Sequence, residues 1–443
     1  MIYQDVLEYL YNSLPMYQRI GKAAYKEDIT NTVKLMAALK NPERKIKTIH
    51  VAGTNGKGSV SHFLASTLQN SGYKVGLYTS PHLVDFRERI RINGTMVSEE
   101  YVEEFVNTHK SLFDEVKPSF FEMTVAMAFC YFAEQNVDIA VIEVGMGGRL
   151  DSTNVIKPIL SIITNIGLDH TQYLGSTLPA IAKEKAGIIK NNVPVIIGES
   201  QSEIEYVFLN KAKEMESKIY FADRNFNVQL LDDSRDDYMH ALIRKGEDYY
   251  SEVKTPLAGS YQLKNLATVA QAVDILREKG YQISDTSFKI GVESVIIDTG
   301  LHGRWEVVST SPTIVCETAH NEDGIKNLMT KLNTMDYDTL HVVYGCVNDK
   351  DYEKILMMLP TKAKYYFCTP SVPRGLDVNI LHNTALSVGL DGERFSSPAQ
   401  ALETAKYAAK WGDVIIVTGS IFLVADVLNI INNTEENEDN KTK

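Results

Sequence analysis

The feature that most limits the possible fold is an alternation of short apolar runs with helical patterns, which extends from about residue 45 to residue 200. The apolar runs are rich in β-branched residues, as buried strands are. Four strands are predicted over residues 45–53, 73–80, 137–145 and 159–167, with helices over residues 58–72 and 120–135. Strands and helices that alternate in this way form βαβ units, so we expect an α/β domain with a largely parallel sheet.

A second series of the same kind begins near residue 312 and predicts a smaller, doubly wound domain. Between the two series, residues 224–256 are polar and alternate weakly, which favours hairpins, and Ser294–Arg304 is the candidate linker. Strands of the second series are predicted over residues 312–317, 340–345, 364–369 and 413–419. We therefore divide the 443 residues into domains 1–297 and 298–430 and a tail, 431–443, that is predicted to be disordered because it lacks apolar periodicity.

Composition excludes several functions. The formal net charge is −12, so general binding to nucleic acid or to an anionic membrane is not expected, because like charges repel. No apolar run reaches the roughly 18 residues that span a bilayer, and the N-terminus lacks the pattern of a secretory signal. The four cysteines form no CxxC pair and are predicted to be core residues in a reducing compartment. We expect a soluble cytoplasmic protein and, by default, a monomer.

The segment His50–Ser59, HVAGTNGKGS, is the most informative for function. It lies between a predicted strand and a predicted helix, where backbone N–H groups and a helix N-terminus can hold phosphate oxygens. It departs from the generic phosphate loop GxxxxGK[ST], because Val51 replaces the first glycine and Gly58 replaces the Ser or Thr. On the loop alone, a glycine-rich structural turn remains the alternative. The candidate nucleotide-binding residues are Gly53, Thr54, Asn55, Gly56, Lys57, Gly58 and Ser59.

The segments that follow make the loop typical of a known family. The loop GTNGKGS resembles that of the Mur ligase superfamily. Four later segments resemble one branch of this superfamily, folylpolyglutamate synthase/dihydrofolate synthase. They are TSPHLVDFRERIRING, EVGMGGRLDSTN, ITNIGLDHTQYLG and IAKEKAGIIK. The likeness continues, in order, through GSYQLKNLATVAQAV, GRWEVV, ETAHNEDG and VTGSIFLV, to about residue 425. The resemblance implies a P-loop domain of the Mur ligase type with a mostly parallel sheet, followed by a smaller Rossmann-like glutamate-ligase domain.

The resemblance also implies a metal site. Ser80, Glu143 and His170 lie at or just after the ends of predicted strands and correspond to the family's magnesium ligands. A hydroxyl, a carboxylate and an imidazole can hold a Mg²⁺ that keeps waters. Lys185 resembles the lysine that the family carries as a carbamate, an anionic ligand for a second Mg²⁺. Loss of water lowers the pKa of a lysine, so that the neutral amine can add CO₂. On residues alone, Lys185 would instead be a helix-surface lysine that pairs with Glu184 or faces solvent.

Further residues are assigned by resemblance to ATP and to catalysis. Asn265, Arg304 and Glu317 are expected to contact ATP. Glu317 and Thr318 begin the run ETAHN where the family pattern has Asp-Gly-Ala-His-Asn, so Glu317 keeps the carboxylate charge but adds a methylene. The candidate catalytic residues are Lys57, Lys185 and His320.

The acid substrate is expected at a separate set of positions. A flat pterin suits the ring of Phe121 and a carboxylate acceptor, although core packing is an equal alternative for Phe121. Gln18-Arg19-Ile20-Gly21 differs from the family's commoner version of a segment that borders the pterin pocket. The candidate substrate-binding residues Phe121, Glu122, Arg149, Leu150 and Asp151 resemble the positions that meet the pterin-bearing substrate in the family. Ser420 is a separate candidate: it lies where the last predicted strand ends and a helix begins, an anion site suited to glutamate.

The implied activity is that of an ATP-dependent amide ligase with Mg²⁺, in two copies, as cofactor. It would add L-glutamate to dihydropteroate, to a folate (poly)glutamate, or to both, through an acyl phosphate. One alternative is a cell-wall Mur ligase, although those enzymes carry a substantial domain before the P-loop and only about 50 residues precede it here. The other is an inactive nucleotide-binding relative, which the Glu317-Thr318 departure motivates.

Overall fold

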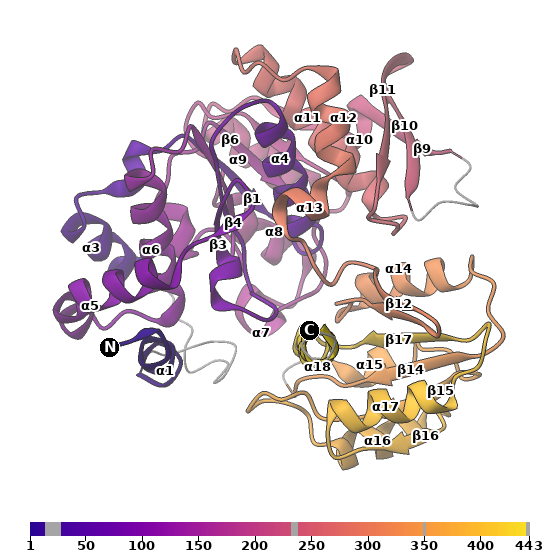
Figure 1. Ribbon diagram of the computed structural model, residues 1–443. Coiled ribbons are helices and arrows are strands. Elements are labelled where there is room, and N and C mark those ends of the chain that lie inside the picture. The colour runs from indigo at the N-terminus through magenta and orange to yellow at the C-terminus, as the bar shows by residue number, and fades with distance from the viewer. Residues whose placement is uncertain (14–27, 232–237, 349–350, 440–443) are drawn as a thin grey trace. The chain divides into compact units, whose positions relative to one another are not determined.

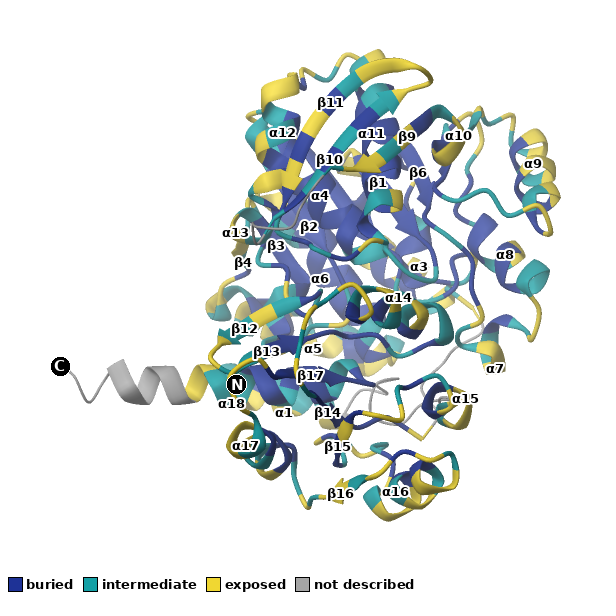
Figure 2. Ribbon diagram, turned by 90° about the vertical axis from the view of Figure 1, so that its right-hand side faces the viewer, coloured by how far each residue is buried: buried dark blue, intermediate teal, exposed yellow. Residues whose placement is uncertain are grey.

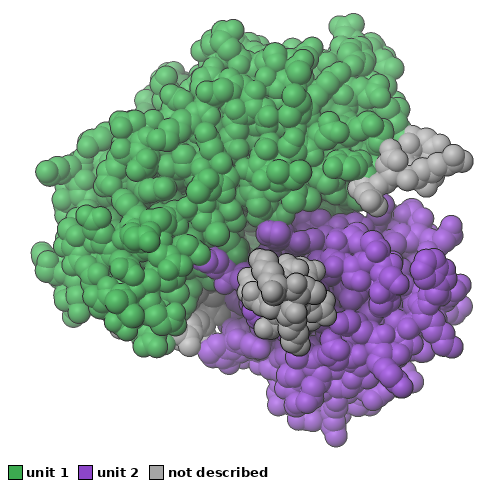
Figure 3. Space-filling model, in the orientation of Figure 1, with its two compact units in different colours: residues 1–82, 86–301 green, residues 83–85, 302–443 purple. Residues whose placement is uncertain are grey.

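The computed structural model describes residues 1–13, 28–231, 238–348 and 351–439. The chain forms two compact units, residues 1–82 with 86–301 and residues 83–85 with 302–443 (Figure 3). The expected boundary at residues 297/298 falls inside helix α13 (Val295–Thr299), which belongs to the first unit. Its Asp298 carboxylate accepts hydrogen bonds of 2.7 Å from Ser66 and Asn70 of helix α4 (Lys57–Asn70). Because these bonds tie α13 to α4, the first unit extends beyond the expected boundary.

The first unit is built on an eight-stranded sheet with the order β4-β3-β2-β5-β1-β6-β7-β8. Neighbours from β2 to β8 are parallel, and β3 and β4 extend the sheet in antiparallel fashion. The four predicted strands, β1, β2, β5 and β6, are confirmed; they lie side by side at the centre and are buried (Figure 2). The strands are β1 (Thr48–Ala52), β2 (Val75–Tyr78), β3 (Ile90–Ile92), β4 (Thr95–Met96), β5 (Ile139–Glu143), β6 (Leu160–Ile163), β7 (Val195–Ile197) and β8 (Ile219–Phe221).

Helices cover both faces of this sheet (Figure 1). The core on one face joins α4 to α11 and α12, and the core on the other joins α1, α3, α5 and α6. Helices α8 and α9 pack around β6 and β7. The helices of this unit, besides α4 and α13, are α1 (Tyr3–Ser13), α3 (Thr30–Ala38), α5 (Glu99–Val116), α6 (Phe120–Glu134), α7 (Thr171–Leu174), α8 (Leu178–Ala186), α9 (Glu205–Glu214), α10 (Ala222–Asn225), α11 (Gln262–Glu278) and α12 (Asp285–Glu293). Its short 3₁₀ helices are η2 (Pro42–Lys45), η3 (Phe86–Arg89) and η4 (Ser152–Val155).

The hairpins predicted for residues 224–256 are confirmed. They form a three-stranded antiparallel sheet of β9 (Phe226–Leu230), β10 (Met239–Lys245) and β11 (Asp248–Thr255). Buried residues alternate with half-buried ones along β10 and with exposed ones along the second half of β11, so one face of this small sheet is in the core of the unit (Figure 2).

The second unit contains a six-stranded sheet with the order β12-β13-β17-β14-β15-β16, in which only β12 is antiparallel to its neighbour. The four predicted strands are confirmed as β13, β14, β15 and β17. The strands are β12 (Glu306–Thr310), β13 (Thr313–Cys316), β14 (Leu340–Tyr344), β15 (Lys364–Phe367), β16 (Gly392–Arg394) and β17 (Val414–Thr418). The helices are α14 (Glu322–Leu332), α15 (Tyr352–Leu356), α16 (Val378–Ser387), α17 (Pro398–Ala408) and α18 (Ile421–Asp439).

Helix α18 corrects the prediction of a disordered tail from residue 431, because it continues to Asp439. Ile430 and Ile431 pack against the core of the second unit, and neither proline nor glycine interrupts the residues that follow, so nothing ends the helix there. The four cysteines are buried, as predicted for core residues. No helix in the described part of the chain combines the length and apolar character needed to cross a membrane.

A chain of buried polar contacts crosses the second sheet. His341 of β14 is fully buried, with Nδ1 2.8 Å from the Tyr366 hydroxyl and Nε2 3.2 Å from Asp413 Oδ2. Burial lowers the pKa of His341, and the Asp413 carboxylate offsets this only in part. Burial acts to raise the pKa of Asp413, but hydrogen bonds from the Lys410 N–H and from His341 outweigh it, so that this pKa is lowered.

We predict that acid destabilises this unit. His341 and Asp413 both bind fewer protons in the folded than in the unfolded state. Their contribution to the free energy of unfolding is therefore complete above about pH 6.5, the ordinary pKa of histidine, and is lost as the pH falls below it.

Both tryptophans, Trp305 and Trp411, belong to the second unit, so their fluorescence during urea unfolding reports on it. The unfolding midpoint should fall between pH 7 and pH 5. His341→Gln, which does not titrate, should show a smaller fall. An equal fall in both proteins would contradict the prediction.

Candidate active site

The sheet of the first unit places four predicted functional segments at one edge. The carboxyl ends of its central parallel strands lie side by side in the order β2-β5-β1-β6. Ser80 follows β2, Glu143 ends β5, the loop Gly53–Ser59 follows β1, and His170 comes after β6. Ligands of open α/β sheets bind outside the carboxyl ends of the strands. Residues that are distant in sequence are thus brought to a single ligand-binding edge.

The loop leaves no room for side chains at two of its glycines. Gly56 has a left-handed backbone with φ of +83°, and Gly53 has φ of +150°. A Cβ atom at Gly53 would lie 1.8 Å from Thr164 Oγ1, and one at Gly56 would lie 2.4 Å from Asn265 Oδ1. Both glycines are therefore required by close packing, which explains their place in the motif.

Residues that follow β6 hold the loop in shape. The Thr54 N–H donates to the Asn165 carbonyl at 3.0 Å, and the Asn55 N–H donates to Asn165 Oδ1 at 2.9 Å. The Gly167 N–H donates to Thr54 Oγ1 at 2.9 Å. Asn165 and Thr164 were predicted only as the end of a strand, although two polar residues directly after an apolar run were the signal that could have identified them.

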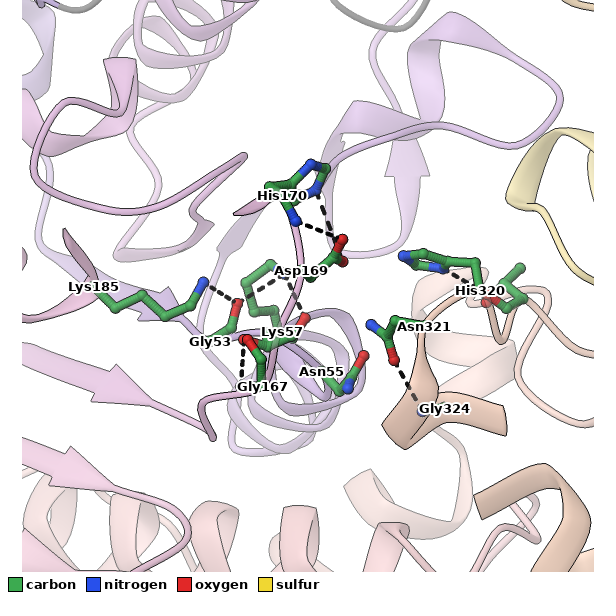
Figure 4. Close-up of polar contacts among 12 residues, drawn as sticks. Gly53, Asn55, Lys57, Gly167, Asp169, His170, Lys185, His320, Asn321 and Gly324 are labelled. Carbon is green, nitrogen blue, oxygen red and sulfur yellow. Dashed lines mark hydrogen bonds and ion pairs between the residues drawn. The ribbon is translucent and has the colours of Figure 1, made fainter. Parts of the chain in front are cut away.

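Lys57 begins helix α4 directly after the loop. Its Nζ donates to the carbonyls of Gly53 and Thr54, each at 3.1 Å, so the ammonium lies over the loop (Figure 4). A positive side chain and a helix N-terminus at one loop form a site for an anion such as phosphate. Asn265, expected to contact ATP, lies against Gly56 and donates to Gln262 Oε1 at 2.7 Å.

Lys185 lies in helix α8 and is buried, with 4% of its surface exposed. Its Nζ donates to the Gly53 carbonyl at 2.9 Å, on the same loop as Lys57 (Figure 4). Burial, and after it the charge of Lys57, lower the pKa of Lys185 to about 7, although Asp169 and Asp151 act to raise it. The alternative of a helix-surface lysine is therefore wrong.

Glu184, the partner considered for Lys185, pairs with Arg149 instead. Its Oε1 accepts from Arg149 Nε at 3.1 Å and from Arg149 Nη2 at 2.9 Å. The Arg149 side chain is 57% exposed. The structure thus gives this arginine a partner within the protein that its sequence context did not indicate.

The predicted metal ligands include one direct contact: the Ser80 N–H donates to Glu143 Oε2 at 3.1 Å, and Glu143 is buried. His170 has a left-handed backbone, and its N–H donates to Asp169 Oδ1 at 2.8 Å. Within the described ranges, no three His, Cys, Asp or Glu side chains are grouped as a metal site. The hydroxyl, carboxylate and imidazole that share this sheet edge nevertheless fit Mg²⁺, which completes its shell with water and phosphate oxygens.

The residues predicted to meet the acid substrate flank Gly145. A Cβ atom at Gly145 would lie 2.4 Å from the Phe121 ring and 3.1 Å from Asp151 Oδ2. Phe121 is half-buried, with its ring 6.1 Å from that of Tyr78. Burial raises the pKa of Asp151, against the hydrogen bonds that this carboxylate accepts.

Two other residues of this set are less informative. Glu122 forms a capping box with Ser119 at the start of α6, with Oε2 accepting the Ser119 N–H at 2.6 Å. Leu150 is partly buried, beside Arg149 in the chain. Gln18-Arg19-Ile20-Gly21 lies outside the described residues.

In the second unit, His320 and Ser420 follow the neighbouring strands β13 and β17. The His320 Nδ1–H donates to the Thr318 carbonyl at 2.9 Å, and Ser420 Oγ accepts the Phe422 N–H at 3.1 Å. The two predicted residues therefore lie at the carboxyl edge of this sheet.

Arg304 and Glu317 also belong to this unit. Arg304 Nη1 donates to the Thr318 hydroxyl and, at 3.2 Å, to the Gly303 carbonyl. Glu317 is buried, and its Oε2 accepts the Trp305 N–H at 2.9 Å. Both residues that depart from the family pattern, Glu317 and Thr318, thus hold the segment that carries Arg304.

Comparison with known proteins agrees with this geometry. The Mur ligase middle domain matches residues 51–273, and the Mur ligase glutamate ligase domain matches residues 303–421. A Bacillus subtilis (strain 168) protein, dihydrofolate synthase/folylpolyglutamate synthase, is 32% identical over 96% of this chain and 98% of its own length. This chain belongs to the folylpolyglutamate synthase/dihydrofolate synthase family of Mur ligases.

Two further members of the family place the match in context. A Haloferax volcanii relative, a probable bifunctional folylpolyglutamate synthase/dihydropteroate synthase, is 34% identical over 89% of this chain, which spans 47% of that protein. Escherichia coli FolC, solved in complex with DHPP and ADP, is 29% identical, with a TM-score of 0.85 over 98% of this chain and 99% of its own. The likeness therefore covers both units.

We predict that Gly56→Ala weakens ATP binding at least about tenfold, because the new methyl meets Asn265 and the backbone is left-handed. Gly246→Ala is the matched control, since Gly246 also has a positive φ, of +60°, but has no atom within 4 Å of the added Cβ. The control should cost about 1 kcal/mol of stability and leave ATP affinity unchanged. Titration calorimetry measures the ATP affinity of each variant. Equal affinity in the two variants would refute the packing argument.

Proposed function

We propose that this protein uses ATP to join the amine of L-glutamate to the carboxylate of dihydropteroate, to the γ-carboxylate of a folate glutamyl tail, or to both. Membership of the family makes the chain an ATP-dependent amide ligase. The observation that carries the proposal is the braced loop at the sheet edge, where Lys57 and Lys185 both bind the Gly53 carbonyl. The near full-length relatives with folate-ligase names favour this function over that of a cell-wall Mur ligase.

The residues of the loop suit the first chemical step. The substrate carboxylate attacks the γ-phosphorus of ATP, the bond from this phosphorus to the bridging oxygen breaks, and ADP leaves. Lys57 and the N-terminus of α4 neutralise negative charge on the transferred phosphoryl group. The glutamate amine then attacks the acyl carbon, loses a proton, and releases phosphate as the amide forms.

Ser80, Glu143 and His170 are proposed to hold a Mg²⁺ at the same edge. When bound, the ion supplies positive charge to the phosphate oxygens of ATP. Lys185 is proposed to carry a carbamate for a second ion. Its buried amine, with a pKa of about 7, is substantially neutral near physiological pH, and a neutral amine is the form that adds CO₂.

Roles in the second unit are proposed by resemblance. Arg304 and Glu317 are assigned to ATP, His320 to catalysis, and Ser420 to glutamate. Glu317 accepts a backbone N–H, and Arg304 is tethered by Thr318, so the departure at residues 317 and 318 has a structural explanation. The main argument for the alternative, an inactive nucleotide-binding relative, is therefore removed.

The deciding experiment measures ADP release by the purified protein. We predict release that requires both L-glutamate and either dihydropteroate or tetrahydrofolate. Lys57→Ala should reduce kcat at least about 10²-fold, since it removes the charge at the transferred phosphoryl group. Release with a different acid only would overturn the pterin assignment, and near-normal turnover of Lys57→Ala would overturn the role of the loop.

Carbamylation of Lys185 has its own prediction. Lys185→Ala should lose most ligase activity and recover part of it in a short carboxylic acid, which replaces the missing anion in the vacated space. Lys183→Ala, an exposed lysine of the same helix, is the control and should remain active. Because Lys185 is buried, Lys185→Met serves as a second variant that keeps the volume.

Carbon-13 NMR of protein equilibrated with ¹³CO₂ tests the modification directly. A carbamate signal is expected in the native protein and in Lys183→Ala, and none at this position in Lys185→Met. A fully active Lys185→Ala enzyme, or an active native enzyme without the signal, would refute the proposal.

A further inference from the structure

His50 is a polar residue in an apolar place. It lies in the middle of β1, between β5 and β6, and is fully buried. Its register partner on β5, Ile142, is an apolar core residue, so an apolar side chain would suit this face of the strand. Burying an imidazole costs free energy unless it makes hydrogen bonds. A histidine at this position therefore requires a hydrogen-bond partner.

That partner is Thr153 of the 3₁₀ helix η4, which is also fully buried. His50 Nε2 lies 2.8 Å from Thr153 Oγ1, and Thr153 Oγ1 donates in turn to Asp151 Oδ1. A hydroxyl has one proton, and Thr153 uses it in the hydrogen bond that it donates to Asp151. The Thr153 oxygen must therefore accept a hydrogen bond from His50 Nε2–H. The three side chains form a relay of two hydrogen bonds, from His50 to Thr153 and from Thr153 to Asp151.

The other nitrogen of His50 supports this order. Nδ1 is buried and has no hydrogen-bond partner among the described residues. Burial lowers the pKa of His50 to about 3, so the ring is neutral with a single proton, and the relay fixes that proton on Nε2. The ring therefore serves a single interaction.

The relay ends at the predicted substrate position. Asp151 Oδ1 also accepts the Thr153 N–H at 3.0 Å, and Oδ2 accepts the Met146 N–H at 2.9 Å. This second oxygen lies against Gly145, which the Phe121 ring flanks as well. A carboxylate fixed at both oxygens beside an aromatic ring is suited to a flat heterocycle that presents N–H donors along one edge.

We propose that His50 and Thr153 are positioning residues that orient the Asp151 carboxylate for an amino-substituted heterocyclic acid substrate. The proposal rests on the function proposed above. Capping of η4 needs only the bond from the Thr153 N–H to Asp151, which an apolar side chain at residue 153 would keep. Capping therefore does not account for the Thr153 hydroxyl or the His50 imidazole, and we assign these two groups to substrate recognition.

The test uses the full-length enzyme and steady-state kinetics with dihydropteroate or tetrahydrofolate, whichever the native enzyme accepts. Thr153→Val keeps the shape and removes the hydroxyl; its KM for the pterin substrate should rise about tenfold, as expected for one hydrogen bond to a charged group. The KM for ATP and the kcat at saturation should stay within about twofold. Thr153→Ser, which keeps the hydroxyl, should behave as the native enzyme.

Variants of His50 give an independent check. His50→Leu should raise the same KM about as much as Thr153→Val, whereas His50→Gln, whose amide can still donate to Thr153, should recover most of the loss. The double variant His50→Leu/Thr153→Val should be no worse than the more affected single variant, because both break one relay. Thr268→Val is the matched control: Thr268 is buried in α11 and donates to the Lys264 carbonyl at 3.0 Å.

The outcomes separate this proposal from the proposed function. A native enzyme that adds glutamate to no pterin acid would overturn the function. A native enzyme that does so, with Thr153→Val and His50→Leu unchanged in KM, would overturn the relay alone. Equal losses in kcat and in both KM values would show a structural role and also overturn it. If Thr153→Val does not fold, His50→Leu against His50→Gln decides by the same criteria.

Discussion

The contact of the phosphate loop with the end of β6 determines the rest of the site. Gly53 meets Thr164 so closely that even a methyl group would overlap it, and Asn165 accepts two N–H groups of the loop. This contact fixes where the Gly53 carbonyl points. Both Lys57 and Lys185 donate to that carbonyl, so the loop also determines the position of the two lysines.

Two lysines at one carbonyl oxygen cannot remain equivalent. Their charges repel in a partly dry environment, and the more deeply buried of the two gives up its proton more readily. Lys185 is that residue, with a pKa lowered to about 7 by burial and by Lys57. The arrangement therefore favours different roles, with Lys57 placed to meet phosphate and Lys185 as an amine that can be neutralised or modified.

The sequence predicted the central strands because strands of a parallel sheet are buried on both faces and appear as continuous apolar runs. Short or edge strands such as β3, β4 and β16 lack such runs, and they were not predicted. The residues of the candidate site were predicted from the family motifs, but their environments could not be predicted in this way. Lys183, Glu184 and Lys185 look equally exposed in the sequence, and only the distant Gly53 carbonyl explains why one of them is buried.

The departure at Glu317 and Thr318 shows how a changed motif can keep a charge in place. Glutamate reaches one methylene further than aspartate, and here its carboxylate accepts the backbone N–H of Trp305, a residue with a left-handed φ of +50°. Thr318, where the family pattern has glycine, adds a hydroxyl that accepts from Arg304 and donates to the Gly303 carbonyl at 3.0 Å. Both changes act on the same three-residue segment, Gly303–Trp305. Both substitutions constrain the segment that carries Arg304. We therefore explain them as a pair of changes that keeps this segment in place, and not as the loss of a nucleotide-binding site.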